Sequence, residues 1–453
     1  SMANHKNEKP GTLSLSRRSL LKLTGGVVVG SVFGCSDDPP QELPLDAAAA
    51  PDMSADTSMD LGTDTAPPPD LSRPDQRPLD SATTKALPGP IFFVHFSDIH
   101  IGSGSFALPA LTYGLNTVLP SFPSIPVVAT GDLCETGNDA KNWAVYQKAI
   151  DGAKLKANDY IEVPGNHDGL LDGALNNYVK YTLAGRNAHG TNGLYHRVHQ
   201  GRRIRIVALN TCSGGNVIMD STGYLTSYQV DALLLQIAND PVKADATIVL
   251  GHHPPTAPMG LATLGTDKNL RKLLKATSAA AYLHGHMHMH YSNWESKTLM
   301  TQAPSLGNPS EGIPGATVPG FNIFALDQGP VARVCWLSGD KTNVSAQWPH
   351  VMITRPADLN LGKKLTSTAT NPWAVPLTKK STGNVLHAGV FAPTPMVSVT
   401  YRVDAGAWLP MKKVTDYYRA EFTAPDKSSC QLEVQAQDSK GSIRSDKIKV
   451  ALA

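Results

Sequence analysis

The chain has 453 residues, 41% of them hydrophobic and 17% charged, which is enough for two or three domains with sizeable cores. Its formal net charge of +2 gives no reason to expect nucleic-acid binding. Residues 1–35 carry five basic residues against one acidic, and residues 36–90 carry three against eleven, which leaves 32 basic against 26 acidic in the rest. A mildly basic folded part suits an anionic substrate.

Residues 1–35 have the features of an export signal. Arg17 and Arg18 precede an apolar run, Leu23 to Phe33, that is too short and too rich in Gly for a transmembrane helix. The paired arginines resemble a twin-arginine signal, and Val32-Phe33-Gly34-Cys35 resembles a bacterial lipobox. These resemblances imply cleavage before Cys35 and a lipid anchor on its thiol. The expected location is the bacterial cell envelope, at the periplasmic or outer surface; the alternative is a basic tail with a chance Cys.

Residues 36–90 are dominated by Asp and Pro. Four of the aspartates recur at four-residue spacing and would repel each other on a helix, namely Asp52, Asp56, Asp60 and Asp64. This composition predicts an extended, disordered tether.

Four cysteines follow the tether: Cys134, Cys212, Cys335 and Cys430. They allow two disulfides in three connectivities, and the sequence does not choose among these. A twin-arginine substrate folds in the reducing cytoplasm before export, which lowers the expectation of any disulfide.

From Ile91 the chain alternates apolar strands with helical stretches. We expect strands at Ile91–Phe96, Val127–Thr130, Tyr160–Val163, Ile204–Asn210, Thr247–Leu250 and Ala279–Leu283. Helices are expected at Leu108–Leu119, Ala140–Lys156, Thr226–Ala238 and Lys268–Lys275. This alternation predicts an α/β domain over residues 91–349, with helices covering a layered sheet and a site at the strand ends.

Residues 350–453 lack helical periodicity. The run Trp348 to Thr354 looks like an exit strand, and alternating strands are expected at Val397–Val403, Tyr417–Phe422, Cys430–Gln437 and Ile443–Val450. This pattern predicts a small all-β sandwich of immunoglobulin type.

Five short motifs each follow a predicted strand of the α/β part. They are Asp98-Ile99-His100, Gly131-Asp132-Leu133-Cys134-Glu135, Gly165-Asn166-His167-Asp168, Gly251-His252-His253 and Gly285-His286-Met287-His288. In this order the set resembles the calcineurin-like metallophosphoesterase family, over Ile91 to about Asp340. The resemblance implies a four-layer α/β/β/α sandwich and a binuclear metal-dependent phosphoester hydrolase.

The resemblance also assigns the ligands. Asp98, His100 and His288 would bind the first metal, Asn166, His252 and His286 would bind the second, and Asp132 would bridge the two. The ligand types accept two divalent or trivalent ions of Mn, Fe or Zn. Phosphoester cleavage needs a nucleophile, neutralisation of the phosphoryl oxygens and a proton for the leaving group, and two metals ~3.5–4 Å apart supply the first two. The expected nucleophile is a hydroxide bridging the metals.

His167 has no place as a ligand and is the candidate general acid. A carboxylate should orient it, and Glu135 is the first choice and Asp168 the second. The other histidines do not match ligand positions: His253 is expected to be a second-sphere or substrate-facing residue, and His284 and His290 are expected to pack or be solvated.

The substrate class is a small-molecule phosphoester. A diester is slightly favoured, because the Gly131–Glu135 loop lacks the Tyr that purple acid phosphatases place three residues past the bridging Asp, and no Arg-rich phosphoprotein phosphatase signature is present. Four arginines are candidates for contacting a second substituent: Arg186, Arg202, Arg203 and Arg271. The alternative function is a surface-anchored binding or adhesion protein with a non-catalytic metal site. The oligomeric state is left open.

Overall fold

The computed structural model describes residues 89–122, 125–187, 190–212, 223–255, 267–308, 318–362 and 370–453. These residues belong to one compact unit, Pro69–Ala453. The predicted signal over residues 1–35, its Cys35, and nearly all of the tether predicted over residues 36–90 lie outside the described residues. Within the described ranges, no helix is both long and apolar enough to span a membrane.

The first sheet has six strands in the order β12-β11-β10-β1-β2-β3. The strands are β1 (Ile91–Phe96), β2 (Val127–Thr130), β3 (Tyr160–Val163), β10 (Gly320–Leu326), β11 (Pro330–Gly339) and β12 (Val344–Ala346). Strands β1, β2 and β3 are parallel, and β10 runs antiparallel to β1, with Ile91 opposite Leu326. Every residue of β1 is buried, as expected for a central strand covered on both faces.

The second sheet also has six strands, in the order β4-β5-β6-β7-β9-β8. They are β4 (Gly193–His199), β5 (Arg202–Ala208), β6 (Ala246–Leu250), β7 (Ala281–His284), β8 (Tyr291–Glu295) and β9 (Thr298–Gln302). Alternate residues of this sheet face opposite layers. Ile206 and Ile248 join the core shared with the first sheet, whereas Val207 and Val249 join a separate cluster with α6 (Ser227–Ala238) and α7 (Asp267–Ala276).

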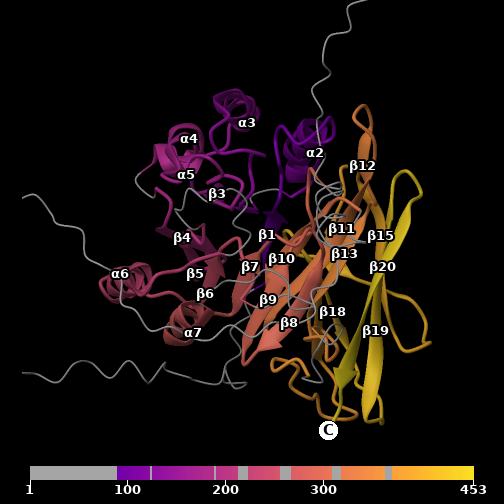
Figure 1. Ribbon diagram of the computed structural model, residues 1–453. Coiled ribbons are helices and arrows are strands. Elements are labelled where there is room, and N and C mark those ends of the chain that lie inside the picture. Colours follow the sequence, from indigo (N-terminus) through magenta and orange to yellow (C-terminus); the bar gives the residue numbers. More distant parts are fainter. Residues whose placement is uncertain are drawn as a thin grey trace, which may run out of the picture. The chain divides into compact units, whose positions relative to one another are not determined.

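Helices accompany both sheets. They are α2 (Ala107–Tyr113), α3 (Ala140–Gly152), α4 (Asn176–Tyr181), α5 (Leu183–Arg186), α6 (Ser227–Ala238) and α7 (Asp267–Ala276). Figure 1 shows α6 and α7 side by side next to the second sheet, and α3, α4 and α5 grouped near β3. The predicted α/β class is confirmed for this part of the chain.

Several predicted bounds need correction. The helix expected at Leu108–Leu119 is α2 followed by one π-helical turn, Gly114–Val118, and one 3₁₀ turn, Leu119–Ser121. Helix α6 begins at a capping box. The Thr226 side chain accepts from the amide of Gln229, and the Gln229 side chain accepts from the amide of Thr226. Strands β4, β8, β9, β10, β11 and β12 were not predicted.

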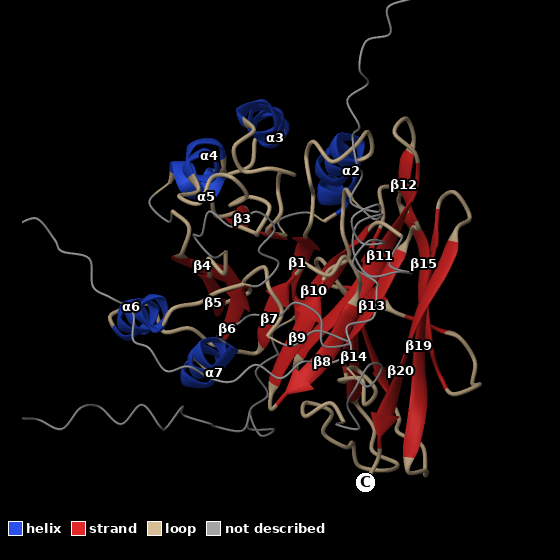
Figure 2. Ribbon diagram, viewed as in Figure 1, coloured by secondary structure: helices blue, strands red, loops and turns tan. Residues whose placement is uncertain are grey.

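The C-terminal part consists of strands and loops in its described residues (Figure 2). One sheet has the order β13-β14-β18-β17 and the other β16-β15-β19-β20, both antiparallel. The strands are β13 (His350–Arg355), β14 (Asn384–Phe391), β15 (Met396–Val403), β16 (Leu409–Pro410), β17 (Lys412–Lys413), β18 (Tyr418–Phe422), β19 (Ser429–Asp438) and β20 (Ile443–Ala451). Both sheets contribute to one apolar cluster that includes Leu386 and Leu432. The immunoglobulin-like assignment and the boundary at residue 349 stay predictions.

The C-terminal sheets are joined firmly to the α/β part. Phe391 of β14 stands edge-on to Phe92 of β1, with ring centroids 5.0 Å apart. The buried Asp327 carboxylate, just after β10, accepts hydrogen bonds from Thr354, Arg355 and His387. Separating the two parts would leave these buried charged groups without their partners, which is costly.

The four cysteines are all free thiols in the structure, and all are buried. Burial raises the pKa of Cys335 to about 12, so this thiol is unreactive at neutral pH.

Candidate metal centre

The seven predicted metal ligands lie on loops at the carboxyl ends of five strands. Asp98 and His100 follow β1, Asp132 follows β2 and Asn166 follows β3. His252 follows β6, and His286 and His288 follow β7. Since β1, β2 and β3 are parallel to one another, as are β6 and β7, each sheet delivers its ligands at one edge.

One group of donors consists of Asp98, His100, Asp132 and His288, whose ligand atoms all lie within 4.8 Å of one another. The Nε2 atom of His288 is 3.2 Å from Asp98 Oδ1 and 3.1 Å from His100 Nε2. Asp132 Oδ2 lies 3.6 Å from His100 Nε2. All four side chains are buried. This is the set that the sequence assigned to the first metal.

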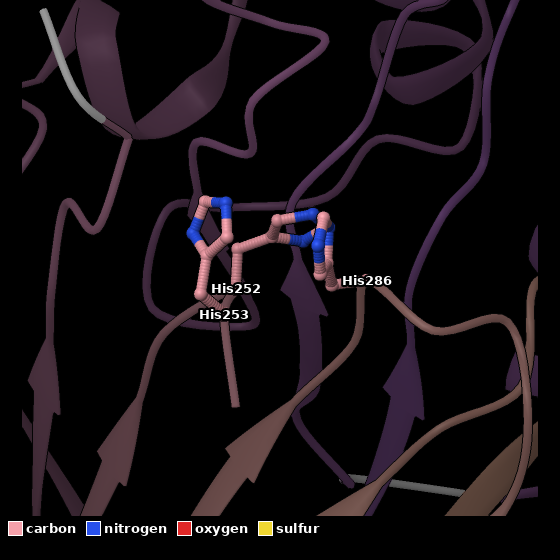
Figure 3. A group of neighbouring side chains, drawn as sticks. All are labelled: His252, His253 and His286. Atoms are coloured by element: carbon pink, nitrogen blue, oxygen red, sulfur yellow. The ribbon is translucent and has the colours of Figure 1, made fainter. Parts of the chain in front are cut away.

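A second group shares Asp132 with the first. Asp132 Oδ2 is 3.2 Å from His252 Nε2, so one carboxylate oxygen faces both groups. Asn166 Oδ1 lies 3.1 Å from His252 Nε2 and 3.1 Å from His286 Nδ1. Figure 3 shows the rings of His252 and His286 together on the loops that follow β6 and β7. The structure therefore brings together the set assigned to the second metal and places the predicted bridging residue between the two groups.

The outer nitrogens of three rings are held by hydrogen-bond acceptors. His100 Nδ1 donates to Glu135 Oε2 at 2.8 Å, His252 Nδ1 to the Thr130 carbonyl at 2.7 Å, and His288 Nδ1 to the Asn308 carbonyl at 2.9 Å. Each outer nitrogen thus carries a proton, and each Nε2 faces the centre, where a metal ion would take the place of a second proton. Histidines that bind metals are oriented in this way.

These contacts test whether the residues fit metal ions. Two imidazole nitrogens, His100 Nε2 and His288 Nε2, are 3.1 Å apart, and they repel each other unless a metal ion or a proton lies between them. Two carboxylates, one amide oxygen and four imidazoles are the ligands that Zn, Mn and Fe accept. The donor set fits two metal ions.

The backbone at the ligands is unusual. Five of the seven ligands have φ in the left-handed region: Asp98 (51°), His100 (54°), Asp132 (51°), His286 (82°) and His288 (55°). This conformation is uncommon for residues other than Gly and concentrates at functional sites. It turns the ligand side chains toward the centre as soon as each strand ends.

The motif glycines are required by close approach to the ligands. A Cβ added to Gly165 would lie 2.2 Å from Asp132 Oδ1, and one added to Gly285 would lie 2.4 Å from Asp98 Oδ2. Any larger residue would displace the carboxylates from the centre.

The charges of the buried ligands stabilise one another. Burial alone would raise the pKa of Asp98, but His288 outweighs burial and lowers this pKa to about 2. His252 in the same way holds the pKa of Asp132 well below its usual range. Burial lowers the pKa of His286 to about 3, which keeps its ring neutral and able to bind a metal. Burial also opposes the charged form of His252, but Asp132 raises its pKa to about 9, so a metal would displace a proton there.

His167, the candidate general acid, lies at the edge of the first group. Its ring is 4.7 Å from that of His100, centroid to centroid, and its Nδ1 is 2.8 Å from the backbone carbonyl of Glu135. The Glu135 carboxylate is 3.9 Å from the same Nδ1 but 2.8 Å from His100. Glu135 therefore holds His167 through its main chain and His100 through its side chain, a division that the sequence did not indicate.

Asp168, the second choice as a partner for His167, is buried and accepts three backbone hydrogen bonds. The donors are the amides of Leu133, Cys134 and Gly165. Burial raises the pKa of Asp168 to about 7. In these contacts Asp168 ties the Asp132 loop to the Asn166 loop.

Of the three other histidines near these motifs, His253 and His284 are buried and His290 is partly buried. His253 Nδ1 is 2.9 Å from Thr211 Oγ1, and its ring lies 4.7 Å from that of His286. His284 stacks on Tyr282 with centroids 5.2 Å apart, and His290 is 2.8 Å from Asn322 Oδ1. His284 and His290 thus pack against the sheets.

The sequence missed the role of Thr211. Its hydroxyl accepts from the amides of both His252 and His253, at 3.2 Å each, and so fixes the loop that follows β6. The only signal was its position directly after a predicted strand.

Comparisons with known proteins concern the α/β part. Residues 93–290 match the family model described as calcineurin-like phosphoesterase. No curated protein matches the chain.

Among solved structures the chain is similar to GAP50 of Plasmodium, the anchor in the inner membrane complex, with 14% identity over 57% of this chain and 88% of that one, at a TM-score of 0.37. It is also similar to a putative 5'-nucleotidase of Staphylococcus aureus, with 13% identity over 57% of this chain and 53% of that one, at a TM-score of 0.37. A third similar structure is the phosphopantetheinyl hydrolase of Mycobacterium tuberculosis, with 15% identity over 49% and 92%, at a TM-score of 0.34.

Proposed function

Because residues 93–290 match the calcineurin-like phosphoesterase model, we propose that the protein hydrolyses small-molecule phosphoesters at a centre of two metal ions. The shared Asp132 carries this proposal, because one carboxylate oxygen lies 3.6 Å from His100 Nε2 and 3.2 Å from His252 Nε2. When bound, two such ions supply an activated water and neutralise the phosphoryl oxygens. Mn, Fe and Zn are the candidates.

The ligand residues prepare the centre for its ions. The amide of His286 donates to both oxygens of Asp98 at 3.1 Å, which links the loops that follow β1 and β7. The amide of His167 donates to Asp132 Oδ1 at 2.8 Å and leaves Oδ2 to face both groups. Such links hold the donors in place before a metal arrives, which lowers the cost of assembling the site.

His167 is proposed as the general acid. Because the Glu135 carbonyl holds Nδ1, the proton for the leaving-group oxygen would come from Nε2. The Glu135 carboxylate is 3.9 Å from the same Nδ1 but 2.8 Å from His100 Nδ1, so its charge acts mainly on His100.

A phosphodiester is slightly favoured over a phosphomonoester. Three of the four candidate arginines have partners elsewhere: Arg186 binds Asp151, Arg202 the Leu326 carbonyl, and Arg271 binds Glu295. These arginines therefore lend no support to the diester, and the preference rests on the Gly131–Glu135 loop, which lacks the Tyr of purple acid phosphatases.

The test is hydrolysis of bis(p-nitrophenyl) phosphate and p-nitrophenyl phosphate by protein loaded with Mn²⁺. We expect turnover with a preference for the diester, near-complete loss in Asp132→Ala, and no change in Asp151→Ala, an exposed carboxylate of the same size. Elemental analysis should give two metals per chain in active protein. A preparation with one metal per chain should be inactive. A metal-loaded protein that hydrolyses no member of a broad phosphoester panel would refute the proposal.

We further propose a four-layer arrangement for the catalytic part, an immunoglobulin-like sandwich for residues 350–453, and a lipid anchor at Cys35 that holds the protein in the bacterial cell envelope. The support for the anchor is the motif around Cys35 alone. In a detergent phase-partitioning assay, the native protein should enter the detergent phase through its lipid anchor. The Cys35→Ser variant should enter the aqueous phase. The alternative, a binding or adhesion protein, is disfavoured because all seven ligands are present.

A further inference from the structure

A pocket with a volume of about 560 Å³ opens on the C-terminal sheet that contains β14, β17 and β18. Its polar lining is mainly basic: Lys412 and Lys413 of β17, Arg419 of β18 and His387 of β14. Tyr417 forms part of its wall. The pocket shares no residue with the metal centre.

The two lysines are the least neutralised charges of the pocket. No ion pair joins Lys412 or Lys413 to a carboxylate among the described residues, and both side chains are exposed. Arg419 is partly neutralised, because its guanidinium is 2.6 Å from Glu421 Oε1. Asp327 lies behind the pocket, where Arg355 at 2.6 Å offsets its charge. The pocket therefore keeps a net positive charge.

One side of the pocket is built from a fixed, buried side chain. His387 is 1% exposed, and its Nδ1 is 2.9 Å from Asp327 Oδ2. The Tyr417 ring stands against it at 4.7 Å, centroid to centroid. No hydrogen bond of His387 Nε2 is found among the described residues, and His387 is one of the residues that line the pocket. The imidazole therefore has a second nitrogen with which it can donate to or accept from a ligand in the pocket.

The pocket lies at the opposite end of β1 from the metal centre. Asp327, which orients His387, directly follows Leu326, and Leu326 pairs with Ile91 at the start of β1. Gly89 touches Tyr417, since a Cβ added there would be 2.5 Å from the ring. The ligands Asp98 and His100 follow the other end of β1, about 20 Å away for six residues of strand. The pocket is too far from the centre to hold part of a small substrate.

We propose that this pocket binds a phosphate group, held by Lys412, Lys413 and Arg419 and contacted by His387. Ammonium and guanidinium groups form strong charge-assisted hydrogen bonds with phosphate oxygens. A phosphate hydroxyl donates to Nε2 of the neutral His387 ring, and the charged ring donates to a phosphate oxygen. The phosphate belongs either to a soluble ion or ester or to an anionic lipid headgroup, which present the same chemistry to these residues.

The test compares two probes on the full chain. Inorganic phosphate binding is measured by calorimetry, and binding to phosphatidylglycerol vesicles is measured by flotation, with phosphatidylcholine vesicles as the neutral reference. The background is Asp132→Ala, which removes the bridging ligand, so phosphate bound at the metal centre does not contribute. This background also separates the test from the proposed activity, because the pocket does not depend on turnover.

We expect Lys412→Gln/Lys413→Gln to weaken binding of at least one probe tenfold or more. The conservative pair Lys412→Arg/Lys413→Arg should retain binding, and Lys154→Gln/Lys156→Gln, two exposed lysines elsewhere, should behave as the parent. Weakened phosphate binding identifies a soluble ligand, and weakened vesicle binding identifies a headgroup. Binding of neither probe, or equal binding by the Gln pair and the parent, would overturn the proposal.

Discussion

The substitution Glu135→Gln separates two roles that this residue could have. Its carboxylate accepts from His100 Nδ1 at 2.8 Å, whereas His167 Nδ1 bonds to its backbone carbonyl at 2.8 Å. The substitution removes the negative charge and leaves the carbonyl in place. The structure therefore predicts an effect on the metal ligand His100 and little effect on the general acid.

The expected magnitude follows from the position of the carboxylate behind a ligand. Loss of such a partner typically costs ten- to a hundredfold in metal affinity, or about 1.4 to 2.7 kcal/mol. At saturating metal, kcat should fall by far less than the ~10²-fold that loss of a general acid costs. The Glu135 side chain is 29% exposed, so water screens part of its charge and the lower end of the range is expected.

The assay is a Mn²⁺ titration of diester hydrolysis, with metal binding measured in parallel by calorimetry. Glu421→Gln, a carboxylate on the C-terminal sheet, serves as the control. If kcat at saturating Mn²⁺ falls a hundredfold while metal affinity stays unchanged, Glu135 acts on His167 through its carboxylate and the reasoning is wrong.

Three further predictions concern other parts of the molecule. His167→Gln should lower kcat by ~10²–10⁴-fold on an alkyl phosphodiester but much less on a nitrophenyl ester, whose leaving group needs no proton; equal losses on both would exclude the general acid role. Burial raises the pKa of Glu162 to about 7, above its ordinary 4.5, so the folded state binds the extra proton between these values. Stability should therefore be fully present below pH 4.5 and fall by on the order of 3 kcal/mol as pH rises through 7. Urea unfolding across this range checks the fall, and Glu162→Gln should reduce it, leaving the part due to Asp168, whose pKa burial also raises to about 7. Asp327→Ala should cost about 3–5 kcal/mol in urea unfolding, since it leaves Arg355 and His387 buried without their carboxylate; a loss below 1 kcal/mol would mean that water replaces it.

The sequence predicted the parts of the fold that carry a strong local signal. Strands β1, β2 and β3 have the predicted bounds, because each is an uninterrupted run buried on both faces. Strand β4 was missed because its residues, Gly193–His199, are only partly buried and include polar side chains at the sheet edge. Helix α4 was missed for a similar reason, since only Tyr178 of its six residues is buried.

The candidate site followed from motif order, but its fine geometry did not. Motif spacing places Asp98, Asp132 and His286 after strands, and parallel strands bring such ends together. The direction of the Glu135 side chain depends on which neighbour comes nearest in space, and His100 is 35 residues away in the chain. Contacts of that kind arise from tertiary packing, which a pattern of residue types does not encode.

The left-handed backbone of the ligands limits how this centre can be redesigned. Asp, Asn and His tolerate that conformation better than other residues with side chains, and they are also the residues that supply metal donors. Five positions must therefore satisfy two demands with the same three amino acids. Exchanges among Asp, Asn and His should alter metal preference with the loops intact, whereas Glu, Cys or a β-branched residue would bring in a new donor or shape only by distorting the loop. Directed evolution of metal specificity is thus expected to select exchanges among Asp, Asn and His at the ligand positions. It is also expected to select changes in the residues that hydrogen-bond the outer nitrogens of the ligand histidines.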